Sequence, residues 1–292
     1  MDDYEEMDAD ETVRKIENVE IQGATNVARA GVHLLRRLAK EGADEERIDE
    51  VTRRLKNARP TEPFLFNCVR VARETGEYDR VLSQIEKQDA IDENGAPLIG
   101  EDDVVYTHCH SSSVTSVLSK VAEEKDFRAR VTETRPLYQG RETARELAET
   151  GVPVRFYVDS GARIALREAD VMMIGADAVL NNGKVINKIG SEMFSEIAGG
   201  YDVPVYVVTN SWKYDPMSSF GYETEIERRA AEEVWGQPPE GVDIVNYAFE
   251  RIAPEKVDGI VSELGVHEPN EFIEAVSDEY PELEETAMNE RN

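Results

Sequence analysis

From residue 104 onward, short runs of β-forming residues alternate with segments of helical periodicity. The β-forming runs are Val104–His108, Ala129–Thr134, Pro153–Val158, Val171–Ile174, Pro204–Thr209 and Val242–Ile244. The helical segments between them are Val114–Glu124, Arg141–Glu149, Arg163–Glu168 and Glu192–Gly199. Such alternation predicts an α/β fold, in which a parallel sheet has helices on both faces and binds ligands at the carboxyl ends of its strands.

The first hundred residues show helical periodicity only. Apolar residues recur at spacings of three and four at Val27, Ala30, Leu34 and Leu38. The same pattern continues over Asp44–Lys56 and Glu62–Arg73, where Cys68 falls on the apolar stripe and is expected in the core. Residues 89–103 are charged and turn-rich, so we place a boundary there. The predicted domains are a helical one over 1–98 and a parallel-sheet one over 99–292.

The formal net charge is -28, from 61 acidic and 33 basic side chains. This excess disfavours nucleic acid and anionic membrane as partners of the bulk surface. The acidic residues are spread along the chain, which favours adaptation to high salt over an acidic protein-binding surface. An anionic substrate would therefore need a locally basic site.

No stretch of 18 apolar residues is present, which predicts no membrane span. The first ten residues, MDDYEEMDAD, lack the basic and apolar regions of a signal peptide. Two cysteines make no disulfide framework in a chain of 292 residues. These features favour the cytoplasm. Neither a G-x-G-x-x-G nor a phosphate-loop pattern follows a strand, so a dinucleotide or phosphate-loop site has no support.

Cys109 lies at a predicted strand end, just before an apolar helical stripe. A helix N-terminus favours anions and lowers the pKa of a thiol, and Ser111 can cap the helix or contact an oxyanion. Spacing alone leaves two alternatives equal: a reactive thiol, or a buried structural cysteine beside capping serines. A zinc site from His108, Cys109 and His110 is disfavoured, because adjacent residues on an extended strand point to opposite faces.

Asp177 follows another apolar run, which ends in Gly-Ala-Asp. Asn182-Gly183 is a strong hairpin signal, and the returning strand would bring Asn187 and Lys188 back near Asp177. A carboxylate, an amide and an ammonium would then converge. The alternative is a turn aspartate with a surface lysine.

Two further segments suit an anion. Arg59 could hold a phosphate with its planar guanidinium, and Gly23 opens a helix whose free amides suit the same group. The alternatives are an arginine at a helix C-terminus and an ordinary helix cap. Residues 133–141 follow a strand and precede a helix, which places this loop at the carboxyl edge of the sheet.

Taken in order, these segments resemble the isomerase family related to the α, β and δ subunits of initiation factor 2B, and within it the archaeal ribose-1,5-bisphosphate isomerases. The matching segments are Gly23-Ala24, Arg59-Pro60-Thr61, Thr107–Ser111, Glu133–Pro136, Gln139-Gly140, Gly175–Asp177 and Asn187–Gly190. Lys213-Tyr214 and Val257–Ile260 with Gly265 also fit the family pattern. The resemblance implies a helical N-terminal domain and a Rossmann-like C-terminal domain.

The resemblance also implies an aldose–ketose isomerase that converts ribose 1,5-bisphosphate to ribulose 1,5-bisphosphate in pentose salvage from nucleosides and nucleotides. Cys109 and Asp177 would be catalytic. The implied substrate-binding residues are Gly23, Ala24, Arg59, Ser111, Arg135, Gln139, Asn187 and Lys188. No metal or organic cofactor is implied, and the expected assembly is a homodimer or a higher homo-oligomer.

Three features depart from the family pattern. One is the segment between the N-terminal helices and Val104, which looks shorter than in the archaeal enzymes. Gln22 stands where the family usually has Arg, and Ser112-Ser113 replaces a stretch that contains Lys. Two alternatives therefore remain: a non-catalytic regulatory subunit like those of initiation factor 2B, and a methylthioribose-1-phosphate isomerase.

The acid excess leads to a first prediction about salt. Ions screen repulsion between carboxylates, so the melting temperature should rise from low salt to molar KCl. Thermal unfolding followed by circular dichroism across a KCl series measures this. A melting temperature that stays level or falls over the series would contradict salt adaptation and favour the protein-binding surface.

Overall fold

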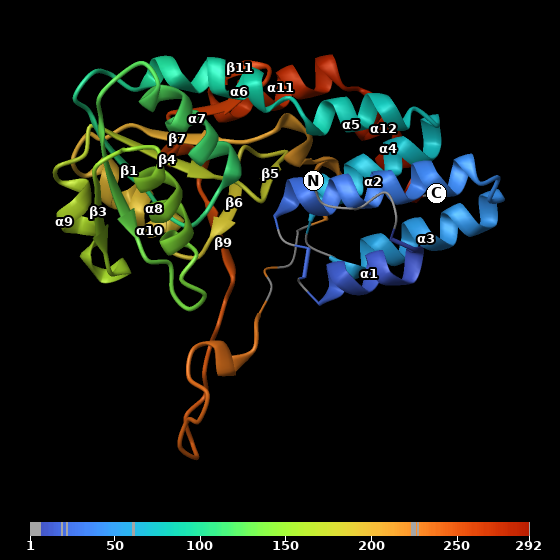
Figure 1. The fold of residues 1–292 in the computed structure, drawn as a ribbon, viewed down its shortest axis with the longest axis horizontal. Coiled ribbons are helices and arrows are strands. Elements are labelled where there is room, and N and C mark those ends of the chain that lie inside the picture. Colours follow the sequence, from blue (N-terminus) through green and yellow to red (C-terminus); the bar gives the residue numbers. More distant parts are fainter. Residues whose placement is uncertain are drawn as a thin grey trace.

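The computed structural model describes residues 7–18, 20–21, 23–59, 62–222, 226 and 228–291. Its N-terminal part is helical and packs beside an α/β part (Figure 1). The N-terminal helices are α1 (Ala9–Glu17), α2 (Ala24–Lys40), α3 (Glu45–Ala58), α4 (Pro63–Thr75), α5 (Tyr78–Ile85) and α6 (Gln88–Gly95). Local signals set their ends. Asp44 caps α3 by accepting from the Arg47 amide, and α4 begins at Pro63 and ends at the left-handed Gly76.

The prediction that residues 89–103 form a turn-rich boundary is partly wrong, because α6 occupies the first half of this segment. Ile91 is 1% exposed and packs with the apolar residues of the sheet. A side chain on Gly95 would meet Val117 at 2.9 Å, so glycine lets α6 lie close to the helix that carries Val117. Tertiary packing thus makes a helix of a segment that looks like a linker.

The main sheet has seven strands in the order β11-β10-β7-β4-β1-β2-β3. They are β1 (Val104–Thr107), β2 (Arg128–Thr132), β3 (Val154–Tyr157), β4 (Val171–Gly175), β7 (Val205–Val208), β10 (Gly259–Ser262) and β11 (Gly265–His267). All neighbours pair in parallel except β10 with β11. Five of the six β-forming runs correspond to strands, so the predicted α/β class with a parallel-dominated sheet is confirmed.

Helices cover both faces of this sheet, as the alternation predicted. The remaining helices are α7 (Ser112–Ala122), α8 (Gly140–Glu149), α9 (Ala162–Leu166), α10 (Ser191–Gly199), α11 (Pro269–Glu279) and α12 (Glu282–Arg291). Along β4, Met173 packs with residues of α6, α7 and α8, whereas Met172 and Ile174 pack with α9, α10, α2 and α4. Cys68 belongs to the same group of buried residues as Met172 and Ile174, and it is fully buried, as expected.

A second sheet of four strands follows the order β8-β5-β6-β9. Its strands are β5 (Ala178–Leu180), β6 (Val185–Lys188), β8 (Tyr214–Asp215) and β9 (Phe249–Ile252). The predicted hairpin at Asn182-Gly183 is confirmed: β5 and β6 pair antiparallel, and Gly183 adopts a φ of 76°.

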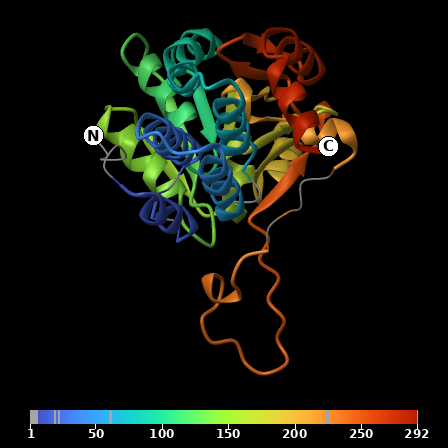
Figure 2. The same cartoon turned by 90° about the vertical axis from the view of Figure 1, so that its right-hand side faces the viewer.

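Val242–Ile244, expected to be a strand, is not one. It lies in an extended arm, residues 228–248, which projects from the body and returns into β9 (Figures 1 and 2). Val242 remains 46% exposed, so its apolar run is not used to build the core. Among the helices of the described part of the chain, none is long and apolar enough to cross a membrane.

Gly140 provides a test of how α8 meets the sheet. A Cβ at this position would lie 1.8 Å from the carbonyl oxygen of Thr132, which is backbone and cannot move aside. Gly140→Ala should therefore lower the free energy of unfolding by several kcal/mol, about as much as other severe packing errors. Chemical denaturation in molar KCl measures the change.

Gly199 is the matched control, because it ends α10 and has no heavy atom within 4 Å of the added Cβ. Gly199→Ala should leave stability unchanged or slightly raised. Equal effects of the two substitutions would contradict the proposed close approach of α8 to β2.

Candidate active site

The order of the main sheet reverses between β1 and β4. The chain runs from β1 outward through β2 and β3, and then returns to the other side of β1 to form β4. Ligands bind at such a reversal, in the crevice beyond the carboxyl ends of the two strands. Cys109 follows β1 and Asp177 follows β4, so both residues come to this crevice.

A cavity of about 1500 Å³ occupies the crevice. The expected site residues that line it are Gly23, Ala24, Arg59, Cys109, Ser111, Gln139, Asp177, Asn187 and Lys188. Its wall has eight lysines and arginines against five aspartates and glutamates. In a chain with a net charge of -28, this is the locally basic site that an anionic ligand requires.

Cys109 is held by its backbone in an unusual conformation. Its φ is 69°, in the left-handed region that residues other than glycine rarely adopt. Its amide donates to Thr134 Oγ1 at 2.9 Å, and its carbonyl accepts from Thr143 Oγ1 at 2.8 Å. These two buried hydroxyls, from the loop after β2 and from α8, fix the direction of the thiol.

The Cys109 thiol is 8% exposed and donates to Gln139 Oε1 at 3.6 Å. Burial raises its pKa to about 11, and the positive charge of Lys188 only partly opposes this effect. The expectation of a lowered pKa at the start of α7 is therefore wrong, because burial outweighs the lowering effect of the His110 amide. Ser111, which caps α7 by accepting from the Val114 amide at 3.4 Å, does serve as the predicted helix cap.

Asp177 lies where the two sheets join, and its amide donates to Ile186 of β6 at 2.8 Å. Burial raises the pKa of its carboxyl group, whereas Lys213, Lys188 and Arg59 oppose the rise. The hairpin returns Asn187 and Lys188 to the same cavity, as predicted. Lys188 is 8% exposed and lies over the Phe249 ring, with Nζ 4.6 Å from the centroid.

The start of α2 forms another wall of the cavity. Gly23 has a φ of 82° and precedes the helix without a side-chain cap, an arrangement that suits an anion at the start of α2. Arg59 follows α3 and lines the same cavity. Gln22, Pro60 and Thr61 lie outside the described residues.

Arg135 does not line the cavity. Its guanidinium donates to Tyr138 Oη and, at 3.2 Å, to the carbonyl of Val234 in the arm. Sequence reasoning left three groups out of the site residues. Lys213, which donates to the Ala176 carbonyl at 2.6 Å, had appeared only as part of the family resemblance. Arg229 of the arm and Arg145 of α8 carry no local motif that would reveal them.

His108 does not point toward a shared metal site with its neighbours. Its Nδ1 lies 2.8 Å from Thr132 Oγ1 and its Nε2 lies 2.9 Å from the carbonyl oxygen of Ile189. A carbonyl can only accept, so Nε2 carries the proton and Nδ1 accepts from the threonine. Both ring nitrogens are thus used to hold the fold together.

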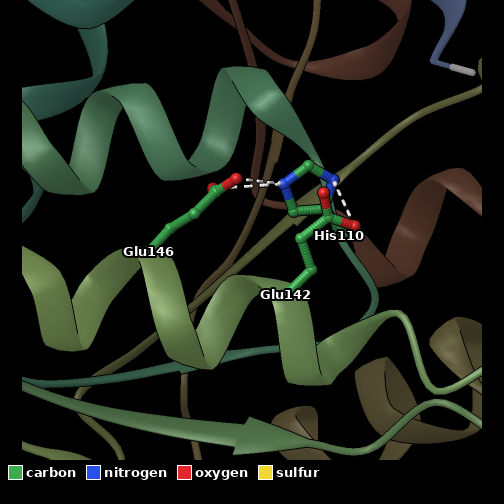
Figure 3. A group of neighbouring side chains, drawn as sticks. All are labelled: His110, Glu142 and Glu146. Atoms are coloured by element: carbon green, nitrogen blue, oxygen red, sulfur yellow. Dashed lines mark hydrogen bonds and ion pairs between the residues drawn. The ribbon is translucent and has the colours of Figure 1, made fainter.

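The group of donors that could hold a metal ion among the described residues is His110, Glu142 and Glu146, whose ligand atoms lie within 4.8 Å of one another. Figure 3 shows that the two carboxylates face different ring nitrogens. Both oxygens of Glu146 lie 3.1 Å from Nε2, and Glu142 lies 3.9 Å from Nδ1. Each ring nitrogen of His110 therefore already faces a carboxylate.

The raised pKa of Cys109 gives a testable pH dependence. Only the thiolate reacts with iodoacetamide, so the alkylation rate should still be rising steeply at pH 10, where the rate of a free thiol has nearly levelled off. Lys188→Met removes the charge that lowers this pKa and should slow alkylation further at the same pH. Mass spectrometry of the peptide that contains Cys109 measures the rate.

Lys184→Met is the control, because Lys184 is an exposed residue of the same hairpin. It should leave the alkylation profile of Cys109 unchanged. A rate that levels off below pH 8 would contradict a thiol whose pKa is raised by burial.

Comparisons with known proteins agree with this architecture. A ribose 1,5-bisphosphate isomerase of Thermococcus kodakarensis is 33% identical over 303 residues, with 92% of this chain and 94% of that protein covered. A methylthioribose-1-phosphate isomerase of Thermoanaerobacter is 30% identical, with 87% and 86% covered. A solved structure of the translation initiation factor eIF-2B of Pyrococcus horikoshii OT3 matches with a TM-score of 0.81 and 27% identity, covering 91% of this chain and 98% of that one. The model of the Initiation factor 2 subunit family matches residues 20–269, and the chain belongs to that family.

Proposed function

We propose that this protein is an aldose–ketose isomerase that converts ribose 1,5-bisphosphate to ribulose 1,5-bisphosphate. The observation that carries the proposal is the pairing of Cys109 and Asp177 beyond neighbouring parallel strands, in a basic cavity of a strongly acidic chain. Relatives named as ribose 1,5-bisphosphate isomerases, at 32–34% identity, support this substrate class.

The cavity offers two kinds of group to a phosphate. The amides at the start of α2 are one, and the charges of Arg59 and Lys188 are the other. Among the described residues, neither cation makes an ion pair within 4 Å, so both are available to an anionic substrate.

The substrate carries a phosphate on its anomeric carbon, so no free aldehyde is available. As Cys109 thiolate takes the proton from C2, the electrons form a C1–C2 double bond and expel the ring oxygen from C1. Asp177 gives its proton to that oxygen. The phosphoenolate then returns to a ketone: the C2 hydroxyl proton passes to Asp177, and the thiol returns a proton to C1. Protons therefore balance over the cycle.

The shifted pKa values of Cys109 and Asp177 bear on this scheme. Burial raises both, and the charge of Asp177 raises that of Cys109 further. In the active form, Asp177 is protonated and Cys109 is a thiolate. In the other form, Cys109 is a thiol and Asp177 is a carboxylate, so the pair carries one proton in both forms. The active form is thus reached by moving one proton within the pair, without exchange with solvent.

Methylthioribose-1-phosphate isomerase is the second candidate, favoured by the Thermoanaerobacter relative. A methylthio group in place of the second phosphate is apolar and uncharged, so a basic cavity suits the bisphosphate better. Assaying both substrates separates the two. Inertness toward both, in high salt, would favour the non-catalytic regulatory subunit.

We further propose that the enzyme works in the cytoplasm as a homodimer or higher homo-oligomer, without cofactor, in pentose salvage from nucleosides and nucleotides. The apolar residues exposed on the arm, among them Trp235 and Val245, support association with another chain. Sedimentation analysis in molar KCl measures the assembly.

Substitution of the catalytic pair tests the mechanism. Cys109→Ser offers an alcohol that is a far weaker base than a thiolate, and Asp177→Asn cannot donate an acidic proton. Each variant should lose at least ~10²-fold in kcat while remaining folded. The double variant should be little worse than the poorer single one, because the two residues act as a unit.

Two controls accompany this test. Cys68→Ala removes the other, fully buried thiol, and Asp126→Asn removes an exposed carboxylate. Both should retain kcat within a few-fold of the unmodified protein. A folded Cys109→Ser protein with near-normal turnover would contradict the assignment of Cys109 as the base.

A further inference from the structure

At the root of the arm, the carboxylate of Glu233 is held as a bound anion would be. Arg229 Nε lies 3.0 Å from both of its oxygens, and Arg229 Nη2 lies 2.6 Å from one. Asn246 Nδ2 donates to the same carboxylate at 3.1 Å. Asn246 is only 5% exposed, and the side chains of Arg229 and Glu233 are 23% and 19% exposed. This is a fork-shaped contact of the kind that arginine makes with carboxylate or phosphate.

The cradle that holds Glu233 adjoins the active-site cavity. Arg229 lines the same cavity as Cys109 and Asp177. Arg229, Glu233, Asn246 and Lys188 also line a smaller pocket of about 10 Å³, which leaves almost no free space. The hydrogen bond from Arg229 is the main cause that lowers the pKa of Glu233, and the charge of Lys188 contributes. Lys188 thus acts on both the catalytic pair and this carboxylate.

We propose that Arg229, Asn246 and Lys188 form a second anion subsite, which Glu233 fills in the free protein and which the distal phosphate of a sugar bisphosphate takes over. The identity of this ligand rests on the proposed function. A phosphate near neutral pH carries up to twice the charge of a carboxylate and has three acceptor oxygens, so it binds the same donors more strongly. Glu233 keeps these donors arranged and supplies a negative charge beside the positive charges of Arg229 and Lys188.

Displacement of Glu233 would move its neighbours. Glu233 ends a short helical turn, Ala231–Glu233, and is followed by Val234, whose carbonyl accepts from Arg135. Arg135 belongs to the loop that carries Gln139, the partner of the Cys109 thiol. Occupation of the subsite is therefore linked through the arm to the loop that contacts the catalytic thiol.

Neighbouring residues provide matched variants. Arg229→Ala removes the fork, whereas Arg228→Ala removes an exposed arginine that lies over the Tyr247 ring at 5.2 Å. Arg229→Ala should raise KM for ribose 1,5-bisphosphate at least about tenfold, as expected for a charge-assisted contact. It should leave inhibition by ribose 1-phosphate, which lacks the distal phosphate, unchanged. Arg228→Ala should change neither.

Glu233→Gln tests the displacement itself. The amide can still accept from Asn246 but holds the guanidinium less strongly, so the subsite opens more easily and KM for the bisphosphate should fall several-fold. Glu232→Gln, at an exposed neighbouring carboxylate, is the control and should have no effect. A KM that rises in Glu233→Gln would overturn the proposal, because it would show that Glu233 only positions Arg229.

Tryptophan fluorescence gives a readout that does not depend on turnover. Trp235 is 50% exposed beside the subsite, and the other tryptophan, Trp212, is fully buried. Titration with inorganic phosphate in molar KCl should change the emission of the unmodified protein and of Arg228→Ala, but not of Arg229→Ala. The same response in both variants would refute the subsite. A protein that shows the expected responses but turns over no bisphosphate would contradict the proposed function alone.

Discussion

The hydrogen bonds of the buried His108 imidazole join the parts on which the site depends. One ring nitrogen accepts from Thr132 of β2, and the other donates to the carbonyl of Ile189 just after β6. The end of β1 is thereby tied to its neighbouring strand and to the hairpin of the second sheet. Burial lowers the pKa of His108 to about 4, so the ring stays neutral and adds no charge beside Cys109.

Charge is distributed in opposite ways on the surface and in the cavity. The acidic surface repels anions, whereas the basic wall of the cavity attracts an anionic ligand. Because salt screens exposed charges more than partly buried ones, high salt weakens the repulsion at the surface while the attraction inside persists. If molar salt also favours folding, as the acid excess predicts, the same ionic conditions would suit entry of an anionic ligand.

Much of the site could be predicted because its residues follow strands in a regular topology. Cys109, Asp177 and the hairpin that carries Lys188 needed only strand ends and one turn signal. The pKa of Cys109 could not be predicted, because it is raised by burial, which depends on the whole fold and outweighs the lowering effects of Lys188 and the His110 amide. The arm was also missed: Val242–Ile244 has the composition of a strand, and nothing in the residues shows that no partner strand lies beside it. Arg229 and Glu233 come from the same arm and were missed for that reason.

The left-handed conformation of Cys109 has an evolutionary consequence. A residue other than glycine in this region costs roughly 1–3 kcal/mol, and the surrounding threonines impose it on the thiol. Replacement by glycine or asparagine, which tolerate this backbone, would relieve the strain. Loss of the thiol would therefore relieve backbone strain, so if Cys109 is the proposed base, selection for the chemistry has to keep the cysteine in place. Without that selection, substitution by glycine would carry no backbone strain at this position, which gives a physical route by which one scaffold can supply both isomerases and initiation-factor subunits.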